Sequence, residues 1–138
     1  MEYATYVEHV RQDGQRLAAA AGGNLSLEVP SCPGWSVRDL VSHTARVYEH
    51  KIACTALGRE PDPWPPKWPA DRDPVEWLGD AHGRLLEMFA ANGPTTPSFT
   101  WWPPDQTVGF WARRMAQETA VHRIDAELAI GSPTPVDA

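Results

Sequence analysis

The sequence is poor in the features that mark several large classes of protein. Two cysteines in 138 residues are too few for a disulfide framework, and they are typical of a cytoplasmic protein. No apolar run approaches the ~20 residues of a membrane span, and no signal peptide opens the chain, so no membrane contact is expected. Basic residues are also scarce, 12 against 18 acidic ones, and the net charge of −6 argues against binding nucleic acid.

Segments with strict apolar–polar alternation are missing too, which argues against strands. The 14 prolines leave four windows free of proline, residues 1–29, 34–60, 75–93 and 105–132. Because proline costs ~3 kcal/mol inside a helix, these windows are where helices can form. Each window carries an apolar stripe with helical spacing. The sequence therefore predicts an all-α four-helix bundle, formed by one domain over residues 1–131.

Local signals predict where the helices begin and end. Ser36, with Asp39 three residues later, is a variant of the capping box that opens the second helix, and Gly58 is its stop signal. Asp73 followed by Pro74 is typical of the start of the third helix. The long loop between these two helices, about fifteen residues, reaches ~45 Å when extended, whereas the second helix is ~33 Å long. An up-down-down-up bundle with a crossover between helices two and three is therefore predicted.

The fourth helix, from about Thr107 to Ile130, carries a carboxylate and an imidazole four residues apart. Glu118 and His122 share the apolar stripe of Trp111, whereas Glu127 is expected on the opposite side. One interpretation is a solvated pair on the surface. A polar pair within an apolar stripe needs partners, however, and a metal ion satisfies both groups at once.

His43 on the second helix is the natural third ligand. It reaches the height of His122 if helices two and four are antiparallel, as in the crossover topology. His82 on the third helix is an alternative ligand, whereas His50 lies ~10 Å from His43 and cannot share its ion. Two histidines and one carboxylate suit Zn²⁺, or nickel or another first-row ion, and leave a position open as in catalytic sites. Asp125, one turn after His122, either orients a ligand histidine or is a surface aspartate.

The two cysteines are expected outside this site. Cys54 lies ~16 Å along the helix from His43 and is interpreted as a small core residue. Cys32 is in the loop before the second helix, near the mouth of the predicted site. A packed thiol is favoured there over a reactive one, because no basic partner is evident.

Two stretches resemble a known family. S-C-P-G-W-S-V-R-D-L-V-S-H, residues 31–43, and W-A-R-R-M-A-Q-E-T-A-V-H-R-I-D-A-E, residues 111–127, are similar to motifs in the metal-binding domain of mycothiol-dependent maleylpyruvate isomerase-like proteins. That domain belongs to the DinB-like superfamily of four-helix bundles with the crossed connection. The resemblance implies a zinc-type site from His43, Glu118 and His122, with mycothiol bound near Trp35.

The resemblance also implies chemistry. The metal binds the low-molecular-weight thiol mycothiol as a thiolate, because coordination removes the thiol proton. In the isomerase the thiolate adds to a cis-alkene, the new single bond rotates, and elimination gives the trans isomer. Transfer of the thiol to another acceptor is the related reaction. The family uses an arginine for its small organic substrate, and Arg72 and Arg84 are the candidates in this sequence.

Members of the family usually continue into a smaller α/β domain, which is expected to be absent here because residues 132–138 resemble a linker-like tail. A non-catalytic metal-binding or regulatory module is therefore an alternative to an enzyme. A metal-dependent hydrolase, in which the ion activates water, is another. A homodimer is kept as a candidate assembly.

Overall fold

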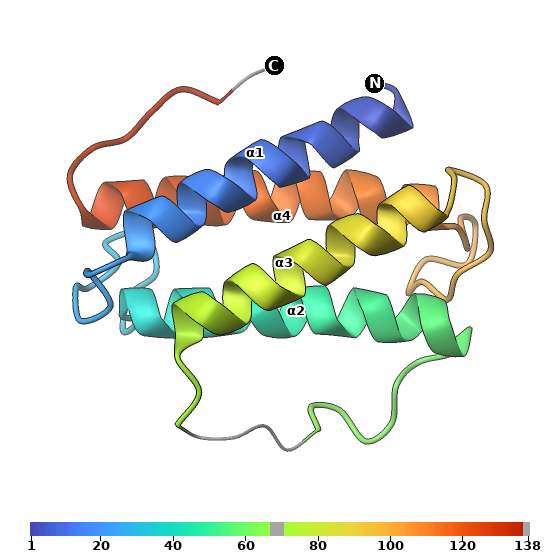
Figure 1. Cartoon of the computed structure of the whole chain (residues 1–138), viewed down its shortest axis with the longest axis horizontal. Helices are drawn as coiled ribbons and strands as arrows, with labels where there is room; N and C mark the ends of the chain where they lie inside the picture. The colour runs from blue at the N-terminus through green and yellow to red at the C-terminus, as the bar shows by residue number, and fades with distance from the viewer. Residues whose placement is uncertain (67–70, 137–138) are drawn as a thin grey trace.

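The fold is a bundle of four helices (Figure 1). The computed structural model describes residues 1–66 and 71–136, so residues 137 and 138 of the predicted tail lie outside it. The helices are α1 (Tyr3–Ala21), α2 (Val37–Leu57), α3 (Pro74–Ala91) and α4 (Val108–Ala129). The described residues include no strand, and the predicted all-α bundle is confirmed. None of the helices described combines the length and the apolar character needed to cross a membrane.

The predicted helix signals act as expected. Ser36 accepts a hydrogen bond from the backbone of Asp39, whose carboxylate accepts one from the backbone of Ser36, so the capping box of α2 is complete. Gly58 ends α2 with φ of 68°, a left-handed conformation that costs glycine nothing. Asp73 caps α3, and Pro74 is its first residue. These residues fix both ends of α2 and the start of α3, and therefore the two points that the connection between the helices must join.

The direction of the helices determines which faces meet. In Figure 1, α1 and α4 run from right to left, whereas α2 and α3 run from left to right. The end of α2 and the start of α3 therefore lie at opposite ends of the bundle. Because α2 and α4 are antiparallel, the beginning of α2 lies beside the end of α4. This arrangement brings the histidines of the two helices to similar heights.

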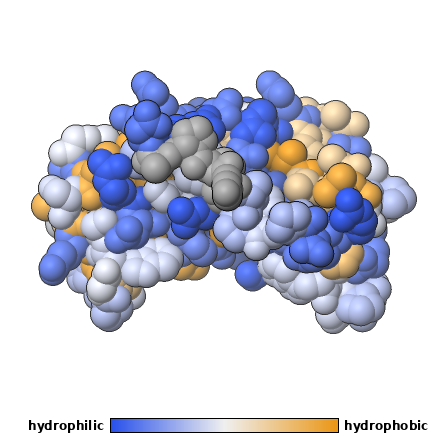
Figure 2. All heavy atoms as spheres, turned by 90° about the horizontal axis from the view of Figure 1, so that it is seen from below, coloured by the Kyte–Doolittle hydropathy of each residue, from blue (hydrophilic) through white to orange (hydrophobic). Residues whose placement is uncertain are grey.

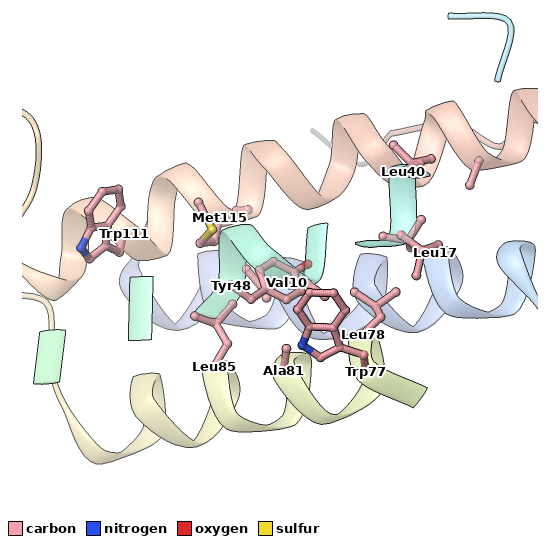
Figure 3. Close-up of a cluster of buried hydrophobic side chains, with 14 of the residues drawn as sticks. Val10, Leu17, Leu40, Tyr48, Trp77, Leu78, Ala81, Leu85, Trp111 and Met115 are labelled. Carbon is pink, nitrogen blue, oxygen red and sulfur yellow. The ribbon is translucent and has the colours of Figure 1, made fainter. Parts of the chain in front are cut away.

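The core fills the space between the helices (Figure 3). The labelled side chains point inward from all four of them, and the largest that are fully buried include Leu17, Leu40, Tyr48, Leu85 and Trp111. Burying one such side chain stabilises the fold by about 1.5–3 kcal/mol. The labelled side chains pack all four helices together, and none of them belongs to the site described below.

His82 has a structural role at the interface between α1 and α3. Its Nε2 lies 2.8 Å from the carbonyl oxygen of Val10, and it donates a hydrogen bond there. Its ring occupies the space beside Gly14, where an added Cβ would lie 2.1 Å from Nε2. The absence of a side chain at Gly14 therefore lets α1 receive the imidazole. Because its Nε2 is bonded to Val10, His82 does not face His43 or His122 and is not an alternative metal ligand.

Glu127, which was predicted on the side of α4 opposite the apolar stripe, is buried there. Its residue is only 6% exposed, because the chain after α4 folds back over it. The guanidinium of Arg123, also fully buried, donates to Glu127 at 3.0 Å and to Asp13 of α1 at 3.2 Å. Thr134 of the tail donates its backbone N–H and its hydroxyl to Glu127 and accepts from Arg123. A buried cation needs such partners, and helical periodicity contains no information about a returning tail.

Candidate metal centre

Three potential ligands from two helices meet at one point. His43 Nε2 lies 3.3 Å from Glu118 Oε1, and His122 Nε2 lies 3.0 Å from the same oxygen. The three ligand atoms all lie within 4.8 Å of one another. A tetrahedral ion with bonds of ~2.0–2.2 Å separates its nitrogen and oxygen ligands by about 3.4 Å. The side chains are therefore already close to the spacing that a bound ion requires.

The sequence positions these groups through helix geometry. Glu118 and His122 are four residues apart on α4, so they lie on one face. His43 faces them from α2. The contact between these two helices is fixed nearby by Tyr48, whose hydroxyl lies 2.5 Å from that of Thr119 in the buried interface. This bond sets the register of α2 against α4 one residue after Glu118.

Asp125 contacts the second nitrogen of His122. Its Oδ2 lies 3.0 Å from Nδ1, so the ring directs Nε2 towards Glu118. The other carboxylate oxygen accepts a hydrogen bond of 2.6 Å from Ser31, and the thiol of Cys32 lies 3.6 Å from Oδ2. The loop before α2 is thus fastened to α4 through the residue that orients His122. Such an outer partner fixes the tautomer of a ligand histidine.

The electrostatics favour charged forms in the metal-free protein. Hydrogen bonds from His122, and then from His43, hold the pKa of Glu118 well below its ordinary value. Burial works against protonation of His122, but its bonds to Glu118 and Asp125 outweigh burial and raise its pKa. Burial also raises the pKa of Cys32, so that residue is a packed thiol rather than a reactive thiolate. The cluster therefore has the anionic oxygen that a divalent cation needs.

The cluster opens to solvent on the side of His43. The exposed fraction of the side chain falls from 37% for His43 to 22% for Glu118 and 11% for His122. Beyond His43 lies a cavity of about 850 Å³. Trp35 is in its wall and packs against the His43 ring, with the ring centroids 5.1 Å apart. A ligand that approached the open side would therefore pass between Trp35 and the cavity.

Comparison with known proteins agrees with this arrangement. The family model described as the mycothiol maleylpyruvate isomerase N-terminal domain matches residues 7–127, which include all four helix cores. The chain belongs to this family. It is therefore also a DinB-like domain. No significant match is found among curated proteins or among solved structures.

Arginines line the cavity beside His43. Arg38, Arg46 and Arg72 contribute to its wall, against the single carboxylate of Asp39. Among the described lining residues the positive charges therefore exceed the negative ones, although the whole chain is acidic. Hydrophilic residues also predominate on the face that Figure 2 shows. The cavity is suited to an anion.

The two arginines predicted from the sequence have different positions. Arg72 lies in the cavity wall and donates to Asp80 at 3.2 Å. Arg84 is held by Asp80 and by Glu49 of α2, and it is not part of that wall. Arg84 therefore joins α3 to α2, whereas Arg72 is available to the cavity.

Sequence reasoning missed Arg38 and Arg46. A signal was present, because Arg38 is inside the motif that ends at His43, and Arg46 follows His43 by one helical turn. An arginine one turn from a metal ligand on the same helix is close enough to reach a substrate beside the ion. The cavity that Arg38 and Arg46 share is also lined by Pro65 and Pro66 of the loop after α2. The local sequence pattern does not predict where that loop lies.

Proposed function

We propose that this chain is the metal-binding domain of a mycothiol-dependent enzyme that isomerises a small organic substrate or transfers the thiol to it. The observation that carries the proposal is the set of His43, Glu118 and His122, preorganised beside a cavity and open on one side. Membership of the mycothiol maleylpyruvate isomerase family supports the thiol as cosubstrate. Three protein ligands with one free position are typical of catalytic rather than structural zinc.

The donor set fits Zn²⁺. Two imidazole nitrogens and one carboxylate oxygen are ligands that zinc prefers, and the thiolate of the cosubstrate would complete a tetrahedron. When bound, the ion supplies Lewis acidity that lowers the pKa of a coordinated thiol from ~8.5. The carboxylate of Glu118 and the incoming thiolate together neutralise a divalent cation. His122 keeps its Nδ1 directed at Asp125 throughout, which holds Nε2 in place.

The chain's own side chains would bind and orient the substrate. Arg38, Arg46 and Arg72 suit the carboxylates of a small anionic acceptor. Trp35 gives the thiol an apolar wall on the open side of His43. Holding the acceptor and the thiol in one cavity converts an encounter of two solutes into a reaction within one complex.

The test uses cobalt as a spectroscopic substitute for zinc. Protein that carries Cys54→Ser, which removes one buried thiol, is loaded with Co²⁺ and titrated with mycothiol. A near-ultraviolet charge-transfer band that appears with the thiol supports direct coordination. The same titration of a Glu118→Ala, Cys54→Ser protein should give no such band. A Trp35→Ala variant in the same background should retain the band but need more thiol.

A different outcome would replace this proposal. If the cobalt spectrum does not respond to thiol but changes with pH around ~7, water occupies the open position and the hydrolase interpretation is favoured. If thiol binds but no cis-alkene or electrophile is turned over in the presence of thiol, the chain is a binding module. Turnover is measured by the loss of substrate absorbance, with the Glu118→Ala protein as the blank.

A further inference from the structure

A second group of potential metal ligands lies at the other end of α2. His50 and Cys54 are four residues apart on one face of the helix, and Glu60 follows the turn that Gly58 makes. The left-handed conformation of Gly58 turns the chain back, so that Glu60 reaches the side chains of the last helical turns. Nitrogen, sulfur and oxygen donors from these three residues all lie within 4.8 Å of one another.

The distances match those of a tetrahedral site. His50 Nε2 lies 3.0 Å from Glu60 Oε1 and 3.8 Å from Cys54 Sγ. For zinc, with bonds of ~2.0–2.2 Å to nitrogen and oxygen and ~2.3 Å to sulfur, these separations are about 3.4 and 3.6 Å. Insertion of an ion would therefore change these two separations by less than about half an ångström. The agreement is as good as at the site of His43.

The side chain of His50 is held by a buried neighbour. Lys51 Nζ lies 2.9 Å from Nδ1 of His50, which leaves Nε2 directed at Glu60. Lys51 is itself fixed between two indoles, 4.3 Å from the ring centroid of Trp101 and 4.6 Å from that of Trp111. An ion bound at Nε2 would leave the ring proton on Nδ1, so Lys51 would then accept a hydrogen bond from Nδ1 as a neutral amine.

His50 and Glu60 are accessible from solvent, whereas Cys54 is fully buried. A cavity of about 350 Å³ is lined by His50, Lys51 and Trp64 and extends to His43. The ring of Trp64 covers His50, with the centroids 5.1 Å apart, whereas Glu60 is exposed. Seven residues separate His43 from His50 on α2, so the two sites lie ~10 Å apart.

We propose that His50, Cys54 and Glu60 bind a second divalent metal ion of the zinc type. The thiolate of Cys54 and the carboxylate of Glu60 neutralise its charge, and Nε2 of His50 supplies a neutral donor. The mixed nitrogen, sulfur and oxygen set selects zinc or cobalt over magnesium or calcium, which prefer oxygen ligands.

A reactive role for Cys54 fits the surroundings less well. Burial raises the pKa of its thiol to about 11, so little thiolate forms in the absence of a metal ion. The buried thiol is therefore a poor nucleophile. The same thiol loses its proton readily to a bound divalent cation.

Cobalt distinguishes the two sites, because His43, Glu118 and His122 contain no protein thiolate. Metal-free protein, kept reduced without a thiol reagent, is titrated with Co²⁺ alone. We expect two equivalents to bind and a thiolate charge-transfer band to appear with no thiol added. Glu118→Ala should lose one equivalent and keep the band. This result would stand even if the proposed use of mycothiol failed.

Variants of the only two cysteines provide the matched control. Cys54→Ser should abolish the band and one equivalent, whereas Cys32→Ser should retain both. Because Cys54 is buried, Glu60→Gln supplies an independent test at an exposed position. This substitution should lower the affinity for the Co²⁺ ion of the second site more than ~10-fold and leave the circular dichroism unchanged. The proposal is overturned if the wild type binds a single equivalent of Co²⁺ and shows no band. It is also overturned if the band survives in Cys54→Ser or is lost in Cys32→Ser, or if Glu60→Gln binds Co²⁺ with unchanged affinity.

Discussion

His122 and Asp125 are joined across one turn of α4, with Nδ1 of the imidazole 3.0 Å from Oδ2 of the carboxylate. The aspartate is in turn held by Ser31, 94 residues earlier in the chain. The position of Nε2, the atom that faces Glu118, thus depends on a loop at the other end of the sequence.

Asp125→Asn should weaken metal binding at this site by about 10–100-fold, because the amide cannot replace the charged partner of the imidazole. Affinity is measured by competition with a chromophoric chelator, in protein that carries Cys54→Ser so that one site is observed. Asp105→Asn, in the loop before α4, is the control and should have no effect. Equal affinities for all three proteins would show that Asp125 does not orient the ligand.

Metal affinity at His43, Glu118 and His122 should fall as the pH decreases. The pKa of His122 in the metal-free protein is raised above 6.5, so its protonated form persists to a higher pH than in a free histidine. Metal binds the unprotonated ring, and protons therefore compete from above pH 6.5 downwards. Titrations between pH 8 and 5.5 measure the effect. An affinity independent of pH over this range would contradict histidine ligation.

Removal of the metal should leave the bundle folded. The side chains labelled in Figure 3 come from all four helices, and none of them is His43, Glu118 or His122. Chelation should therefore preserve the helical circular dichroism and lower the melting temperature only by the lost binding energy. Loss of most of the helical signal on chelation would instead show that the ion is structural.

Gly14→Ala should destabilise the protein by ~1–3 kcal/mol, because the new methyl group would overlap the ring of His82. The imidazole is bonded to Val10 and has little freedom to move. Gly79→Ala is the matched control, since a Cβ there meets nothing within 4 Å and the helix should gain ~0.5–1 kcal/mol. Denaturant unfolding measures both changes. Stabilisation by both substitutions would show that the α1–α3 interface is not as close as described.

Much of the fold could be predicted, because its signals are local. Proline positions limit the helices, and Ser36, Gly58 and Asp73 determine their ends through contacts within a few residues. The pairing of His43 with Glu118 and His122 could be proposed from helix spacing and the motifs. Its chemical role remains a proposal, because spacing does not identify what occupies the open position.

Other features depend on contacts that periodicity cannot contain. Glu127 was predicted on the side of α4 away from the apolar stripe, and its burial there was not predicted: Arg123 needs acceptors, and the tail returns to supply more. Cys54 has the burial expected of a core residue. Its nearness to Glu60, however, depends on a turn after the helix, and the relation between the two residues is visible only in three dimensions.

The return of the tail has a practical consequence for handling the protein. Arg123 directs the segment after α4 back along the bundle, and Figure 1 shows the N-terminus and the described tail, up to residue 136, on the side of α1 and α4, away from the loop that follows α2. The arginine-lined cavity is bordered by that loop. An affinity handle or fluorescent label fused at either end, or a tether to a sensor chip, should therefore leave the cavity open to small molecules.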